Sequence, residues 1–295
     1  MTTRTLNVGL IGGGFMGGVH ARSARAAGAD VVAVATSAAD ARRLVDAARE
    51  AGLVATVPFV YRFHPMAREA RDRVRAGGRI FTVQGAYLQD WLLDADDDDW
   101  RTDPAAGGPS RAFADIGSHL ADLTEFVAGE RIARLQALTR TVHPERNGHP
   151  VSSEDAAAVV VETESGAIGT LLVSQVAAGH DNGLVLEIAT AGGSVRFEQE
   201  EPNRLWLGGR GESTLLTRGG SQNGPDAQRL SLVPPGHPMG YLDAFAAFVR
   251  DSYAAIGGAV PDGLPTFEDG LRAARLTDAV VRSAETGDWV DTAPA

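Results

Sequence analysis

The sequence has no cysteine, and each of its 27 lysine-plus-arginine positions is an arginine, so it also has no lysine. Without cysteine, disulfides, thiolate nucleophiles and cysteine-ligated metals are excluded. Without lysine, a Schiff base and a lysine proton donor are excluded. Arginine cannot replace lysine in proton transfer, because its guanidinium keeps its proton near neutral pH.

Positive charge and long apolar runs are also scarce. The 295 residues carry a formal net charge of −11, which argues against a nucleic-acid-binding surface. The first apolar run, within "VGLIGGGF", is soon broken by glycine and is too short for a signal peptide or a membrane span. We therefore expect a cytoplasmic protein with about two domains, at roughly 100–200 residues per domain.

The run that glycine interrupts has the pattern of a nucleotide-binding turn. A short apolar strand at 5–12 is followed by a helix at 12–28, and glycines with G-x-G-x-x-G spacing lie at the junction. Such glycines permit a tight turn and let the backbone approach a pyrophosphate at the helix N-terminus. The pattern predicts a site for NAD or NADP; the alternative is a glycine-rich turn in an unrelated α/β domain. The positions expected at the cofactor are Gly12, Gly14, Phe15, Met16 and Gly17.

The second strand, at 30–37, ends at Thr36 and Ser37. Dinucleotide sites often have an acidic residue there to bind the ribose. Small polar residues leave room for a 2′-phosphate, so the choice between NAD and NADP stays open. A helix at 37–52 follows at once, and we expect a third strand at 54–59 beside the first two.

From residue 79 onward, short strands alternate with turns. The strands are expected near 79–90, 132–142, 154–164, 167–178, 183–190, 193–199 and 203–208, the helices near 64–78, 110–128, 240–256 and 267–286, and a long loop at 209–236. The predicted fold class is α/β plus α+β. Residues 1–59 form a truncated Rossmann-type parallel sheet, and residues 60–295 form a larger domain with an open, mostly antiparallel sheet and flanking helices.

Three segments give the chain a family resemblance. They are "VPFVYRFHP" (57–65), "GGPSRAFADIGSHLADL" (107–123) and the ending that starts with "HPMGYLDAFAAFV" (237–249). In this order they resemble the Gfo/Idh/MocA family of nicotinamide-dependent oxidoreductases, and "DIGSH" is the most specific piece. The resemblance implies NAD or NADP as cofactor and a small sugar, cyclitol or related polyol as substrate. It also implies a homodimer or homotetramer formed through the open sheet.

The same resemblance implies an internal deletion in the Rossmann domain. In the family, further α/β units follow the second strand, and one of them carries a Glu-Lys-Pro motif. Here the helix that should follow those units begins directly after the second strand, near Thr36. About two βαβ units, roughly 60–80 residues, are therefore missing, and the lysine with them. Because the nicotinamide normally lies over the missing strands, we expect the binding of NAD or NADP to be weak or lost. Recombination between short repeats and an incomplete sequence are both open as the origin.

Asp115, His119 and Asp122 have the spacing i, i+4 and i+7, which places them on one face of a helix. A carboxylate beside an imidazole orients the ring and raises its proton affinity. The resemblance implies that Asp115 and His119 contact the hydroxyl that is oxidised, with Asp122 as a further substrate contact. The alternative from the pattern alone is a helix N-cap at Asp115 and a packed helix histidine at His119.

The resemblance places further substrate contacts at Arg62, Trp100, Arg101, His237 and Tyr241. For Arg62 the alternative is an ion pair at the domain junction. The acidic run 96–99 is more typical of a solvated loop than of a metal site, and we expect no metal. Two functions stay open. The protein is either a sugar or polyol oxidoreductase, or a family member without catalysis that acts as a binding or scaffold protein or is a deletion product.

Overall fold

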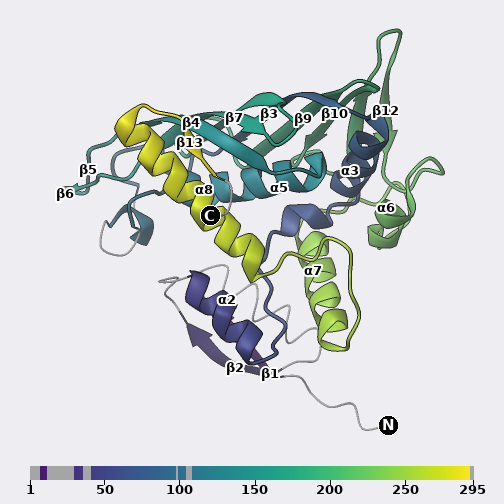
Figure 1. The fold of residues 1–295 in the computed structure, drawn as a ribbon, viewed down its shortest axis with the longest axis horizontal. Helices are drawn as coiled ribbons and strands as arrows, with labels where there is room; N and C mark the ends of the chain where they lie inside the picture. The colour runs from purple at the N-terminus through teal and green to yellow at the C-terminus, as the bar shows by residue number, and fades with distance from the viewer. Residues whose placement is uncertain (1–6, 12–29, 36–40, 98, 104–107, 293–295) are drawn as a thin grey trace. The chain divides into compact units, whose positions relative to one another are not determined.

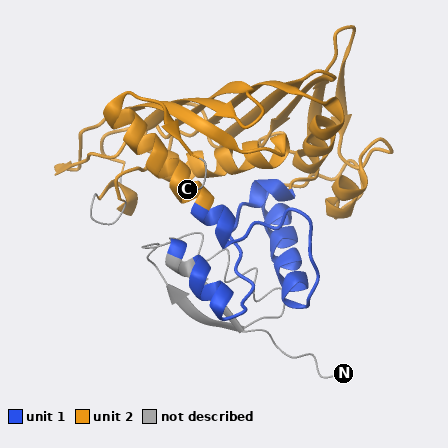
Figure 2. Cartoon of the chain, in the orientation of Figure 1, with its two compact units in different colours: residues 1–63, 241–271 blue, residues 64–240, 272–295 orange. Residues whose placement is uncertain are grey.

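The computed structural model describes residues 7–11, 30–35, 41–97, 99–103 and 108–292. The chain divides into two compact units, shown in Figure 2. Unit 1 comprises residues 1–63 and 241–271, and unit 2 comprises residues 64–240 and 272–295. The segment 241–271, which we expected in the second domain, is thus grouped with the N-terminal residues.

The first two strands of unit 1 lie as the sequence predicts. β1, Asn7–Ile11, pairs in parallel with β2, Asp30–Ala35. The predicted helix after β2 is present as α2, Ala41–Glu50. Parallel neighbours need a crossover between them, and the predicted crossover helix lies within residues 12–29, outside the described residues.

The predicted third strand at 54–59 is wrong. This segment makes one isolated antiparallel bridge, from Thr56 to Thr266, and joins neither β1 nor β2. Pro58 has no N–H to donate to a ladder, and the 3₁₀ helix η1, Val60–Phe63, begins two residues later. The sheet in the described part of unit 1 therefore has two strands.

Aromatic packing explains why 241–271 belongs to unit 1. Its helix α7, Tyr241–Ile256, packs against η1. The Phe63 and Phe248 ring centroids lie 5.6 Å apart in an edge-to-face arrangement, and Phe245 contacts Phe248 at 5.9 Å. Edge-to-face aromatic pairs add to the stability that apolar burial provides.

Unit 2 is built on a nine-stranded sheet with the order β12-β11-β10-β9-β3-β8-β7-β4-β13. Within the described strands of this sheet, β3 and β8 are the one parallel pair, so the predicted mostly antiparallel sheet is confirmed. A separate small hairpin joins β5 to β6. The strands of unit 2 are β3 Ile80–Leu88, β4 Ile132–Arg140, β5 Glu145–Arg146, β6 His149–Pro150, β7 Ala156–Thr163, β8 Ile168–Ser174, β9 Gly183–Thr190, β10 Gly193–Glu198, β11 Arg204–Gly208, β12 Ser213–Thr217 and β13 Val290–Asp291.

Helices cover one face of this sheet, as Figure 1 shows for α3, Pro65–Gly77, and α5, Ser118–Ala128. A Cβ atom on Gly85 of β3 would lie 2.9 Å from Leu171 and 3.0 Å from Leu120 of α5. Glycine at this position therefore lets α5 lie close to the sheet. α8, Phe267–Thr286, is the last helix. No helix in the described ranges is long and apolar enough to cross a membrane.

The predicted loop at 209–236 is wrong in two places, because it contains β12 and a short helix, α6, Pro225–Leu230. β12 completes the edge of the sheet by pairing with β11. At the start of α6, the Gly224 N–H donates to the Glu69 carboxylate of α3 at 2.7 Å. Partners from distant parts of the chain thus order a segment whose local composition favours a loop.

Candidate functional site

The helix that carries the "DIGSH" residues begins with a π-helical turn, η3, Phe113–Gly117, which leads directly into α5. The Ser118 N–H donates to the Phe113 carbonyl, five residues back. A Cβ atom on Gly117 would lie 2.5 Å from the Phe113 ring, so this turn requires glycine. Asp115 lies inside the turn, and single π-helical turns are frequent at functional sites.

Both carboxylate oxygens of Asp115 have partners. Gln175 Nε2 donates to Oδ2 at 2.9 Å, and Arg101 Nε lies 3.4 Å from Oδ1. Burial raises the pKa of Asp115, while the Arg101 charge and the Gln175 hydrogen bond act in the opposite direction. The Asp115 side chain remains 28% exposed, so a ligand hydroxyl could donate to a remaining lone pair.

Arg101 and Trp100 come from the 3₁₀ helix η2, Trp100–Thr102. Asp99 caps this helix by accepting from the Arg101 backbone N–H at 2.9 Å and from its Nη1 at 3.0 Å. The Arg101 guanidinium lies 4.7 Å from the centre of the exposed Trp100 ring. Asp99, Trp100, Arg101, Asp115 and Gln175 therefore form one group, here termed the Asp115 cluster.

His119 and Asp122 lie on α5, beyond the π-turn. Burial lowers the pKa of His119 to about 4, so the imidazole is neutral at pH 7. The expectation that a neighbouring carboxylate raises the proton affinity of His119 is wrong, because the cause of its pKa shift is burial, which disfavours the charged ring. Asp122 is buried. The N-cap alternative for Asp115 does not hold either, since the residue lies inside η3.

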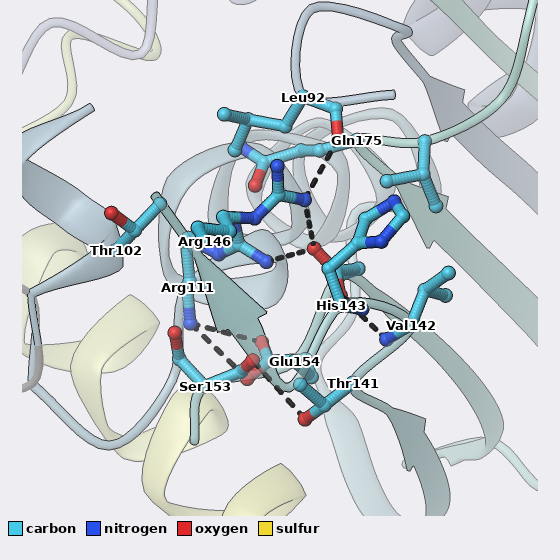
Figure 3. A network of polar contacts seen from close by, with 12 residues as sticks. Leu92, Thr102, Arg111, Thr141, Val142, His143, Arg146, Ser153, Glu154 and Gln175 are labelled. Carbon is cyan, nitrogen blue, oxygen red and sulfur yellow. Dashed lines mark hydrogen bonds and ion pairs between the residues drawn. The ribbon is translucent and has the colours of Figure 1, made fainter. Parts of the chain in front are cut away.

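A buried charge network, drawn in Figure 3, underlies the cluster. Asp155 Oδ1 accepts from Arg111 Nη2 and, at 2.9 Å, from Arg146 Nη2. Its Oδ2 accepts from the backbone N–H groups of Val142 and His143 at 2.6 and 3.1 Å. Burial alone would raise the pKa of Asp155, but the two arginines hold it below its usual range.

The buried charge network contacts the backbone of both Gln175 and Asp115, whose side chains are hydrogen-bonded to each other. The Asp155 carbonyl accepts from the Gln175 N–H, and the Arg111 carbonyl accepts from the Asp115 N–H, each at 2.9 Å. Sequence reasoning missed Gln175, Arg111 and Asp155. Two of these residues could have been noticed as polar residues at the ends of mostly apolar strands. Gln175 directly follows one such strand, and Asp155 directly precedes another.

Arg146 connects the network to the loop before η2. Its Nη1 donates to the Asp94 carbonyl at 2.6 Å, and its Nη2 donates to the Leu92 carbonyl at 2.8 Å. The described residues of the acidic run 96–99 follow in this loop. Among the described residues, no group of three or more histidine, aspartate or glutamate side chains could hold a metal ion.

The remaining predicted substrate residues lie outside the Asp115 cluster. Buried Arg62 pairs with Asp269 at 3.0 Å, so Arg62 forms an ion pair as in its alternative, but both partners belong to unit 1. Tyr241 begins α7, and burial raises the pKa of its hydroxyl to about 12. In unit 2, the side chain of His237 is exposed, while its carbonyl accepts from Arg218.

The predicted cofactor positions lie outside the described residues. They are Gly12, Gly14, Phe15, Met16, Gly17, Thr36 and Ser37. The described strands that flank them are β1, which ends directly before the first glycine, and β2, which ends directly before Thr36. Parallel pairing of these strands agrees with the first strand pair of a dinucleotide-binding domain.

Comparison with known proteins identifies the family. Residues 67–196 match the model of the GFO/IDH/MocA C-terminal domain. The crystal structure of an oxidoreductase domain protein from Kribbella flavida is 30% identical to this chain, with a TM-score of 0.79 over 94% of this chain and 77% of that one. The chain belongs to the Gfo/Idh/MocA family. The recognition made from the sequence is thereby confirmed.

Two further comparisons concern levoglucosan dehydrogenases. Levoglucosan dehydrogenase from Pseudarthrobacter phenanthrenivorans is 28% identical over 288 residues, covering 88% of this chain and 72% of the relative. The structure of a levoglucosan dehydrogenase in complex with NADH and L-sorbose is 26% identical, with a TM-score of 0.84 over 99% of this chain and 100% of that one. Both are similar to this chain along most of its length.

Proposed function

We propose that this chain binds NAD or NADP together with a sugar, cyclitol or related polyol, as an oxidoreductase of its family does. The observation that carries the proposal is the Asp115 carboxylate, partly exposed in a π-turn and held between Arg101 and Gln175. It lies within the segment that matches the family model. Levoglucosan dehydrogenase, a relative with a complex of NADH and L-sorbose, supports the choice of cofactor and substrate class.

The chain's own residues suit the recognition of a hydroxyl. A hydroxyl donates its hydrogen to the Asp115 carboxylate, which orients the carbon that carries it. Neutral His119 is able to accept a proton, and its low pKa makes it a weak base. When bound, the nicotinamide cofactor accepts the hydride. The positive charge of Arg101 favours the ionised form of Asp115, which is the form that accepts a hydrogen bond from the hydroxyl.

The described strands fit a dinucleotide. β1 ends directly before Gly12, and its parallel pairing with β2 is what the first unit of such a domain requires. Gly12, Gly14 and Gly17 would hold the pyrophosphate. Thr36 and Ser37 leave both NAD and NADP open as cofactors.

A second candidate function is ligand binding without turnover. Two observations favour it: the sequence has no lysine, and the sheet in the described part of unit 1 has two strands. The internal deletion that the family resemblance implies would account for the loss of the motif lysine and for the two-stranded sheet. Such a protein would keep the Asp115 cluster as a polyol-binding site and would act as a binding or scaffold protein.

The binding experiment uses isothermal calorimetry with NADH and NADPH, followed by levoglucosan and L-sorbose on the cofactor-loaded protein. Replacing Asp115 with asparagine should weaken sugar binding by about tenfold or more, because a hydrogen bond to a charged group is lost. Cofactor binding should be unchanged. If Asp115→Asn binds the sugars as well as the wild type does, the assignment of this site is wrong. Absorbance of the reduced cofactor separates turnover from binding alone.

We also propose that two or four copies associate through the uncovered face of the sheet. Leu138 of β4 is 74% exposed and lies opposite Ala158 of β7, which in turn lies opposite the exposed Leu172 of β8. The row continues through Ala86 of β3 to Val185 of β9. An apolar row across five strands is typical of a surface that another protein covers.

A further inference from the structure

We propose that Gln175 is a positioning residue that fixes the orientation in which Asp115 meets a substrate hydroxyl. This inference rests on the proposed function and assigns a role to a residue that touches Asp115 rather than the reacting atoms. Gln175 follows the last residue of β8, and its side chain is fully buried. Its Nε2 donates to Asp115 Oδ2 at 2.9 Å.

Within the part of the chain that the structure describes, the Gln175 side-chain amide makes one hydrogen bond, to Asp115. Among the described residues, its Oε1 has no hydrogen-bond partner, so the bond to Asp115 is what orients the amide. Burial of an amide whose second polar atom is unsatisfied costs free energy, and such a group in a folded protein calls for an explanation. We explain this cost by the role of Gln175 in orienting the Asp115 carboxylate.

Both ends of the bond are fixed through the backbone. The Gln175 N–H donates to the Asp155 carbonyl, and its carbonyl accepts from the Leu92 N–H at 3.1 Å. The Asp115 N–H donates to the carbonyl of Arg111, whose guanidinium pairs with the Asp155 carboxylate. One buried aspartate therefore sets the positions of the glutamine and of the turn that carries Asp115.

The Gln175 amide donates a hydrogen bond to Asp115 without bringing a second positive charge to the carboxylate. It occupies one lone pair of Oδ2 without adding a charge, while Arg101 faces Oδ1. The remaining lone pairs then point in fixed directions toward a ligand donor. The charged groups near the Asp115 carboxylate are Arg101, Asp99 and Arg111. Gln175 fixes the orientation of the Asp115 carboxylate and leaves the net charge of these groups unchanged.

The test measures the titration of the Asp115 carboxyl itself, so it does not depend on turnover. Protein labelled with carboxyl-¹³C aspartate is followed by NMR against pH, and Asp115→Asn assigns the signal. Gln175→Leu should raise the Asp115 midpoint by about one unit, a tenfold change in proton affinity, because a hydrogen bond to the charged form is lost. Gln175→Glu should raise it further, since two carboxyls then share one site.

Gln199→Leu is the matched control, because Gln199 is also a buried glutamine with an unsatisfied Oε1 among the described residues. It follows β10, which β9 and β3 separate from β8. This variant should leave the Asp115 midpoint unchanged. Gln175→Glu retains the size of the side chain and serves as the probe if the leucine variant does not fold.

Sugar binding provides the second readout. With NADH bound, Gln175→Leu should weaken levoglucosan or L-sorbose binding by about tenfold, and Gln199→Leu should not. An unchanged Asp115 midpoint in both folded Gln175 variants would overturn the inference. A shifted midpoint in a protein that binds neither sugar would overturn the proposed function instead, and would support the control of Asp115 by Gln175.

Discussion

Among single residues, burial acts on Asp115 and His119 in opposite directions, because it penalises the charged form of each. It raises the pKa of the carboxyl, where Arg101 and Gln175 counter it. It lowers the pKa of the imidazole to about 4. The two neighbours of Asp115 favour its ionised form, whereas the His119 ring stays neutral over the physiological pH range.

The depressed pKa of His119 makes a prediction about stability. The folded protein binds this proton less tightly than the unfolded chain, so stability is complete above pH 6.5 and falls as the pH drops toward 4. Relative to His119→Gln, the wild type should lose about 2 kcal/mol between pH 7.5 and pH 5. Urea unfolding of both proteins at the two pH values measures the difference. Parallel losses in the two proteins would show that His119 is not buried as a neutral group.

The sequence identified Asp115 through a local motif, but it could not identify its partners. Gln175 lies 60 residues further along the chain, and the contact depends on where β8 ends. Arg101 was expected near the substrate, yet its contact with Asp115 depends on a loop that Arg146 holds from a distant hairpin. Such pairings follow from tertiary packing, which no local pattern encodes.

Among whole elements, the predictions succeeded where the hydrophobic period was regular. The strands of the large sheet alternate buried and exposed residues, and their positions agree with the sequence. The failures have local causes. Pro58 prevents the third strand, distant partners order α6, and the crowding of Phe113 against Gly117 accompanies a π-turn where an α-helix was expected.

The buried network should be a main stabilising element of unit 2. Arg146→Met removes one of the two arginine partners of buried Asp155 and the donor to the Leu92 and Asp94 carbonyls, so it should cost about 3 kcal/mol, because buried polar groups that lose hydrogen bonds are expensive. Arg134→Met, which breaks an exposed pair with Glu162, should cost less than about 1 kcal/mol. Urea unfolding of the two variants tests the contrast. Similar losses in both would mean that Arg111 alone neutralises Asp155.

For the whole molecule, the uncovered face of the sheet predicts an oligomer. We expect charged residues introduced on this face to dissociate it. Leu138→Glu combined with Leu172→Glu places two carboxylates in the apolar row and should give a monomer, because burying an unpaired charge opposes association. Light scattering after size exclusion measures the mass, and circular dichroism checks the fold. Val260→Glu, at a residue of unit 1 that is 96% exposed, is the control and should leave the mass unchanged. A wild type that is already monomeric would contradict the prediction.

The last prediction concerns activity, which the whole chain must support. The second candidate function, binding without turnover, predicts little or no dehydrogenase activity, because the lysine of the family motif is absent, and proton-transfer help of that kind is worth about 10²–10⁴-fold. Adding a lysine alone should not restore turnover, since the segment expected between Thr36 and Ala38 would also set the distance from nicotinamide to Asp115. An error of about 1 Å in that distance can cost roughly 10²-fold.

The measurement is reduced-cofactor absorbance with a panel of sugars and polyols, using both NAD and NADP. It compares the wild type, His119→Ala and a chain that carries the corresponding segment grafted from a relative after Thr36. Turnover in the graft alone would support a loss of geometry through deletion, because every residue of the Asp115 cluster is the same in both proteins. Clear wild-type turnover that His119→Ala abolishes would contradict the prediction and would make His119 the working acid–base group, despite a pKa of about 4.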